Sequence, residues 1–180
     1  MTDDFTTQKK YPQLSQAVAV YSEMLHWLVA MYNSKDPTET VMALGLLDRL
    51  FYSSEPLDRL SRLLSKWVPG TCTREYLCDL TEIVHVTLKL LEANAAKCED
   101  LAMKTQKKGK KADKNFRDTI ERMRMNAAEY DVNSYIVKKV VSNQVVNMYT
   151  HLLSQYAVNS PQVNHRIISF FLRLMKIKVI

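Results

Sequence analysis

The chain has 180 residues, of which 47% are hydrophobic, and it carries a formal net charge of +6. This length suffices to bury the core of one ordinary domain. Three glycines and five prolines are too few for the many tight turns of a β-sandwich or β-barrel, so the composition favours an all-α fold.

The sequence also bears on where the protein resides. It has no apolar run of about 18 residues that could cross a bilayer, and residues 1–10 are too polar for a signal peptide. We therefore expect no membrane association and no secretion. The three cysteines, Cys72, Cys78 and Cys98, are odd in number and lack zinc-ligand spacing, which predicts reduced, mostly structural thiols.

Four helices are predicted in the first half of the chain. Apolar residues recur with helical spacing over 14–32. Asp36-Pro37 and Ser54-Glu55-Pro56 each combine a capping side chain with a proline in the first turn, so a helix is expected after each. A longer fourth helix is expected to begin after Thr73 and to end near Leu101.

A basic segment follows at 104–114. Residues 104–117 contain seven basic side chains against one acid, which accounts for the whole net charge. The segment has too few apolar residues to offset the entropic cost of ordering, so we predict a flexible loop. Three interpretations stay open: an inert loop, a nuclear-import signal, or an electrostatic, sequence-indifferent DNA contact. The last two would use Lys107, Lys108, Lys110 and Lys111.

Further helices are predicted beyond the basic segment. A weak helix begins near Phe116, a β-branched stretch at 135–141 is interpreted as helix, and a clear helical stripe covers 145–156. Ser160-Pro161 predicts the start of a last helix. We thus expect an all-α, armadillo-like or HEAT-like solenoid segment of about seven to eight helices. Its helical repeats would occupy 1–103 and 115–180 and would continue in a longer protein.

No catalytic motif is found. The three glycines are scattered, so the sequence contains no phosphate-binding loop, and no nucleophile motif is present. We expect no enzyme activity, no cofactor and no metal. One alternative stays open, because Glu23-x-x-His26 and Glu82-x-x-His85 repeat the ligand pairing of di-metal helical bundles. That design needs a further glutamate helix before the first pair, and none precedes Glu23.

Two stretches resemble the Timeless family of replication-fork proteins. Residues 76–92 are similar to the family's Tyr-Leu-x-Asp-Leu-x-Glu-x-x-His helix, which also precedes a lysine-rich insertion. Residues 131–139 and 145–153, followed by Asn159-Ser160 and the Asn164-His165 pair, are similar to a helix pair of the same family. Together the two stretches span about two-thirds of the chain, in the family's order.

The resemblance implies a non-enzymatic, nuclear armadillo-like solenoid segment of the fork protection complex. The implied partners are a Tipin-like protein, replisome components and DNA, and the implied role is fork stability and S-phase checkpoint signalling. A circadian, partner-binding protein of the Timeless type is the alternative within this ancestry. The family motifs imply structural or partner contacts at Asp79, Glu82, His85, Tyr149, Asn164, His165 and Arg173.

Overall fold

A computed structural model shows that the protein is all-helical over the residues it describes, which are 11–51, 55–68, 70, 72–107 and 114–177. None of its described helices is long and apolar enough to cross a membrane. The helices are, in chain order, α2 (Tyr11–Tyr32), α3 (Pro37–Phe51), α4 (Glu55–Ser65), α5 (Arg74–Lys107), α6 (Lys114–Glu129), α7 (Val132–Tyr135), the π-helix η2 (Ile136–Val140), α8 (Asn143–Ser154) and α9 (Pro161–Lys176). The predicted all-α class is confirmed, while the repeat arrangement stays a prediction.

Side-chain caps set several helix starts. Asp36 Oδ1 accepts a hydrogen bond from the Thr38 amide at 2.8 Å before α3, and Ser160 accepts one from the Val163 amide before α9. Both starts were predicted from the cap-and-proline pattern. Ser142 caps α8 in the same way, by accepting from the Val145 amide. Each cap satisfies an amide that the first helical turn leaves without a partner.

The long helix α5 corrects the predicted boundary of the basic segment. It has 34 residues and ends at Lys107, whereas we expected an end near Leu101 and a loop from Lys104. Lys104 Nζ lies 2.6 Å from Asp100 Oδ2 one turn earlier, and Ala102 and Thr105 are buried, so the extra turns have a packed face. Residues 108–113 lie outside the described part.

The β-branched stretch near Ile136 is helical, as predicted, but its geometry is unusual. The short helix α7 continues directly into η2, and the Val141 amide donates to the Ile136 carbonyl across five residues at 2.9 Å. This is the wide turn of a π-helix, which occurs mostly as a single turn. Ile136 and Val140 are both buried, so the wide turn brings two β-branched side chains into the core.

The chain forms two compact units, and each takes residues from both sides of the basic segment. Unit 1 contains the described parts of 1–27, 58–87 and 133–180, and unit 2 those of 28–57 and 88–132. Helices α2 and α5 therefore contribute one part to each unit. This grouping interleaves along the sequence, and the division into helical repeats at 1–103 and 115–180 stays a prediction.

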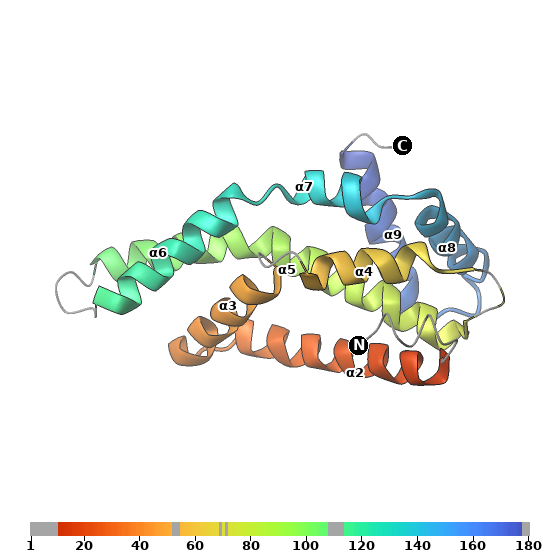
Figure 1. Cartoon of the computed structure of the whole chain (residues 1–180), viewed down its shortest axis with the longest axis horizontal. Helices are drawn as coiled ribbons and strands as arrows, with labels where there is room; N and C mark the ends of the chain where they lie inside the picture. The colour runs from red at the N-terminus through yellow and green to blue at the C-terminus, as the bar shows by residue number, and fades with distance from the viewer. Residues whose placement is uncertain (1–10, 52–54, 69, 71, 108–113, 178–180) are drawn as a thin grey trace. The chain divides into compact units, whose positions relative to one another are not determined.

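In unit 1, α8 and α9 pack side by side (Figure 1). The Tyr149 ring on α8 stacks on Phe170 of α9 with the centroids 3.9 Å apart, and both side chains are buried. Burial also raises the pKa of the Tyr149 phenol above its ordinary value. Tyr149, which the resemblance marked as a structural or partner contact, thus lies inside the core of this unit.

In unit 2, α6 packs on α3 and on the second part of α5. A Cβ placed on Gly45 of α3 would lie 3.5 Å from the Met123 methyl carbon of α6, which is an ordinary contact distance. Arg124 of α6 donates to Glu99 of α5 at 3.1 Å and also to Glu121. Lys97 donates to the Tyr32 carbonyl at the end of α2, and its Nζ lies 4.0 Å from the Tyr32 ring centroid.

Candidate interaction site on α2, α5 and α9

Three acidic residues lie along one face of α5 in unit 1. Glu75, Asp79 and Glu82 are spaced by four and three residues, which places them on successive turns of the same helix face. The resemblance had singled out Asp79 and Glu82. Because like charges at this spacing repel, the face needs cations or protons nearby to be stable.

Two basic residues from other helices meet at Glu82. His26 Nε2 of α2 lies 3.1 Å from Glu82 Oε1, and Arg166 of α9 donates a hydrogen bond to the same oxygen. The Glu82 and Arg166 side chains are only 18% and 17% exposed, so this ion pair is largely withdrawn from solvent. A shielded, hydrogen-bonded pair fixes the side-chain geometry more firmly than an exposed one.

Asp79 lies near several other carboxylates. Its pKa is raised above the ordinary aspartate value, chiefly by burial and then by the neighbouring charge of Glu82, and Glu23 and Glu75 add to the effect. Arg166 acts in the opposite direction. The Asp79 carboxylate is therefore disfavoured in its charged form, because burial and like charges both oppose ionisation.

His85 and His165 form a second contact between α5 and α9. Their ring centroids are 5.6 Å apart in an edge-to-face arrangement, and His165 Nε2 lies 3.4 Å from the Ser169 hydroxyl. The structure thus places His85 against His165, two residues that the sequence marked in separate motifs. Edge-to-face packing of this kind orients two rings and helps to fix the crossing of the helices that carry them.

A hydrogen-bonded network fastens the α8–α9 connection. Asn159 Nδ2 donates to the Leu152 carbonyl at 2.7 Å and to Asn164 Oδ1 at 3.1 Å. Asn164 Nδ2 in turn donates to the Tyr156 carbonyl at 2.9 Å. Arg74, at the start of α5, donates to Asn159 Oδ1 at 2.9 Å. Each amide group therefore acts as donor and acceptor at once, which defines one conformation of the connection.

The remaining candidate residues, Arg173 from the resemblance and the four lysines from the basic segment, lie in separate places. Arg173 of α9 donates to the Ser169 carbonyl one turn earlier at 3.4 Å. Lys107 is the last residue of α5, and Lys108, Lys110 and Lys111 lie outside the described residues. The lysine cluster therefore remains a sequence-based prediction.

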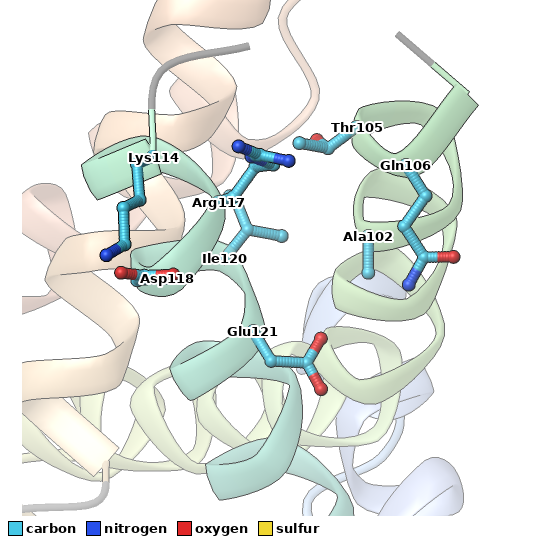
Figure 2. Close-up of a pocket in the computed structure, with 8 residues that line it drawn as sticks. All are labelled: Ala102, Thr105, Gln106, Lys114, Arg117, Asp118, Ile120 and Glu121. Carbon is cyan, nitrogen blue, oxygen red and sulfur yellow. The ribbon is translucent and has the colours of Figure 1, made fainter. Parts of the chain in front are cut away.

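The end of α5 and the start of α6 line an open pocket of about 450 Å³ in unit 2. Figure 2 shows Arg117 of α6 directed towards Thr105 of α5, while Lys114 and Asp118 lie next to each other on α6. The lining includes two basic and two acidic side chains, since Glu121 also faces this space. Its mixed charge favours no ligand of a single sign.

The di-metal alternative does not match this geometry. His26 of the first Glu-x-x-His pair does approach Glu82 of the second, but Arg166 donates to the same carboxylate oxygen. A guanidinium therefore occupies the position that a metal cation would need. Within the described ranges, moreover, no three His, Cys, Asp or Glu side chains are grouped so that they could hold a metal ion.

Sequence reasoning missed two arginines that organise the site. Arg166 neutralises Glu82, and Arg74 completes the asparagine network. Arg166 directly follows the marked Asn164-His165 pair, so its position gave one available signal. A basic residue on the core side of an apolar helix predicts an acidic partner. The sequence position of the basic residue does not identify which acidic residue is that partner.

The fold and the site together define an all-α protein whose helix pair α8–α9 is joined to α5 by polar contacts. Residues 143–178, which contain that pair, match the family model described as TOF1-like, helical domain. A comparison with curated proteins finds no match. The family match supports a TOF1/Timeless-like relationship for this part of the chain.

Proposed function

We propose that this chain is a non-enzymatic scaffold segment of a Timeless-like replication fork protection protein. The observation that carries the proposal is the family match over 143–178, because it covers the α8–α9 pair and its asparagine network. The resemblance at 76–92 supports it independently, since this segment lies in α5 and supplies Glu82 and His85 to the same site.

Packed helical hairpins suit such a role. They bury one face against their neighbours and leave the other face as a binding surface. On α9, Val163, Ile167, Phe170 and Leu174 are buried, whereas Ile168, Leu172 and Met175 are exposed. A helix that is apolar on two faces is typical of a segment that packs between partners.

The proposed partners are a Tipin-like protein, replisome components and DNA, in the nucleus. The DNA contact is assigned to Lys107, Lys108, Lys110 and Lys111, which would bind phosphates without reading sequence. If all four lysines contact phosphate, the loss of DNA affinity between low and moderate salt is about 100-fold greater for the wild type than for a variant without these lysines.

The test is a pull-down of Tipin and duplex DNA by the 180-residue chain at low and moderate salt. The test variant carries Ala at Lys107, Lys108, Lys110 and Lys111. A control variant carries Ala at four scattered, exposed lysines, Lys35, Lys89, Lys138 and Lys176, so both lose the same charge. Loss of DNA in the test variant alone, with Tipin retained, supports both parts of the proposal.

Other outcomes contradict one part each. Equal DNA loss in the two variants would mean that net charge, and not the lysine cluster, holds DNA. Failure to retain Tipin or replisome components would reject the fork scaffold, and co-purification with a clock protein would favour the circadian alternative.

A further inference from the structure

The outer face of α2 carries a stripe of large apolar side chains. Val20, Met24 and Trp27 are spaced by four and three residues and are 61%, 62% and 73% exposed. This spacing aligns all three along one side of a helix. Trp67, the other tryptophan, is buried, so the exposure of Trp27 is not a general property of this residue type in the chain.

Acidic side chains border this apolar stripe. Glu23 directly precedes Met24 on α2 and is exposed. Glu23 and Glu75 both interact electrostatically with Asp79 of α5, whose pKa is raised chiefly by burial and then by Glu82 and these two carboxylates. His26 and Arg166 are both directed to Glu82. Several carboxylates thus lie on the side of the stripe towards Asp79, although the whole chain carries +6.

We propose that the stripe formed by Val20, Met24 and Trp27 is the docking face for a basic amphipathic helix of a partner protein. Such a helix would place its apolar residues on the stripe and its lysines or arginines beside Glu23 and Asp79. An exposed tryptophan flanked by smaller apolar residues is typical of an interface anchor.

The charges select this occupant over two others. A second copy of the chain would bring the same acidic border against itself, which opposes self-association through this face. Nucleic acid would be repelled by the carboxylates of Glu23, Glu75 and Asp79. This partner is distinct from the DNA contact proposed for the lysine segment, and its test does not depend on Tipin.

The probe is a synthetic, tryptophan-free helical peptide of about 20 residues, with leucines at i, i+3, i+4 and i+7 and lysines at the flanks. A control peptide has the same leucines with glutamates at the flanks. Fluorescence anisotropy of each labelled peptide is measured against the full 180-residue chain at two salt concentrations. Because the protein is basic overall, non-specific attraction would favour the glutamate peptide.

We expect the lysine peptide to bind at least about tenfold more tightly than the glutamate peptide and to weaken with salt. Its binding shifts the Trp27 emission to shorter wavelength, because the indole leaves water. The Trp27→Phe variant retains only the buried Trp67 and loses this shift. Trp27→Ala weakens the lysine peptide about 30-fold, the effect of removing an interface anchor.

Matched methionines provide the control for the surface. Met24→Ala weakens the lysine peptide, while Met42→Ala, at a residue of α3 that is 58% exposed, leaves its affinity unchanged. Equal affinity for both peptides, or equal effects of the two methionine variants, would overturn the proposal. So would a concentration-dependent dimer in sedimentation that shields Trp27 without peptide, because this would assign the face to a second copy.

Discussion

His26 Nε2 on α2 lies 3.1 Å from Glu82 Oε1 on α5, so the histidine of the first Glu-x-x-His pair contacts the glutamate of the second. Arg166 of α9 adds a hydrogen bond to the same oxygen. Glu82 thus connects three helices of unit 1, and several measurable consequences depend on it.

Substituting Glu82→Gln removes the charge while keeping the shape of the side chain. Arg166 would then keep a shielded positive charge without its counter-ion, so we expect the free energy of unfolding to fall by about 1–3 kcal/mol. Urea denaturation measures this change. Asp100→Asn is the control, because its ion pair with Lys104 is exposed and should contribute less than about 0.5 kcal/mol. Equal losses in both variants would contradict the special role of Glu82.

The raised pKa of Asp79 predicts a pH dependence of stability. The folded state binds this proton more tightly than the unfolded state does, so the contribution of Asp79 to stability is greatest in acid. It is lost as the pH rises from the ordinary value of about 3.8 through the raised folded pKa. We therefore expect Asp79→Asn to stabilise the protein at pH 7 and to have less effect near pH 4.

Denaturation of wild type and Asp79→Asn at several pH values tests this sign. Asp118→Asn, at an exposed position of α6, serves as a comparison, because substitutions at exposed positions of this kind usually change stability by less than about 0.5 kcal/mol. An Asp79→Asn variant that is less stable than wild type at pH 7 would show that its carboxylate makes a favourable contact in the charged form.

The asparagine network predicts a large effect from a small side chain. Asn159→Ala removes the contacts to Leu152, Asn164 and Arg74 and leaves the buried Leu152 carbonyl without this donor, which should cost about 2–3 kcal/mol. Asn147→Ala, at an exposed position of α8, should change stability by less than about 0.5 kcal/mol. Combining Asn159→Ala with Asn164→Ala should give less than the sum of the two losses, because they share a contact.

Two glycines should respond in opposite ways to alanine. In Gly45→Ala the new methyl group meets Met123 at an ordinary contact distance of 3.5 Å, so the gain in helix propensity should raise stability by up to about 1 kcal/mol. Gly70 has a φ of +79°, which disfavours any residue with a Cβ, so Gly70→Ala should lower stability by about 1 kcal/mol. Thermal denaturation of both variants checks the signs.

The cysteines should differ in their reactivity towards iodoacetamide. Burial, together with the nearby charge of Asp48, raises the pKa of the Cys98 thiol to about 11, so little thiolate forms at pH 8. Cys72 is partly exposed. We expect Cys72 to be alkylated first and Cys98 only after unfolding, as peptide mapping by mass spectrometry would show. Rapid labelling of Cys98 in the native protein would contradict its buried position.

Local signals in the sequence predicted much of the helical structure. The starts near Asp36 and Ser160 followed from side chains that cap amides a few residues away, and the structure confirms both. The predicted end of α5 near Leu101 was wrong. The Asp100–Lys104 pair and the buried Thr105 extend the helix through an otherwise polar stretch. The π-turn at Ile136–Val140 was not predicted, since β-branched residues signal neither helix type specifically.

The site could be predicted only in part. Glu82 and His85 were marked through a resemblance, but the meeting of His26 with Glu82 depends on how α2 lies against α5, which no local pattern specifies. The roles of Arg166 and Arg74 depend equally on long-range packing. A cap acts within one helical turn, whereas these contacts join residues separated by more than fifty positions.

The interleaved composition of the two units has a consequence for synthesis on the ribosome. Every segment of unit 2 precedes residue 133, whereas unit 1 needs α8 and α9 from the last part of the chain. At roughly 5–20 residues per second, unit 2 has all its residues for seconds before unit 1 does. Unit 2 can therefore fold first on the nascent chain. The N-terminal part of α2 belongs to unit 1, so its core is complete only after α8 and α9 have been synthesised.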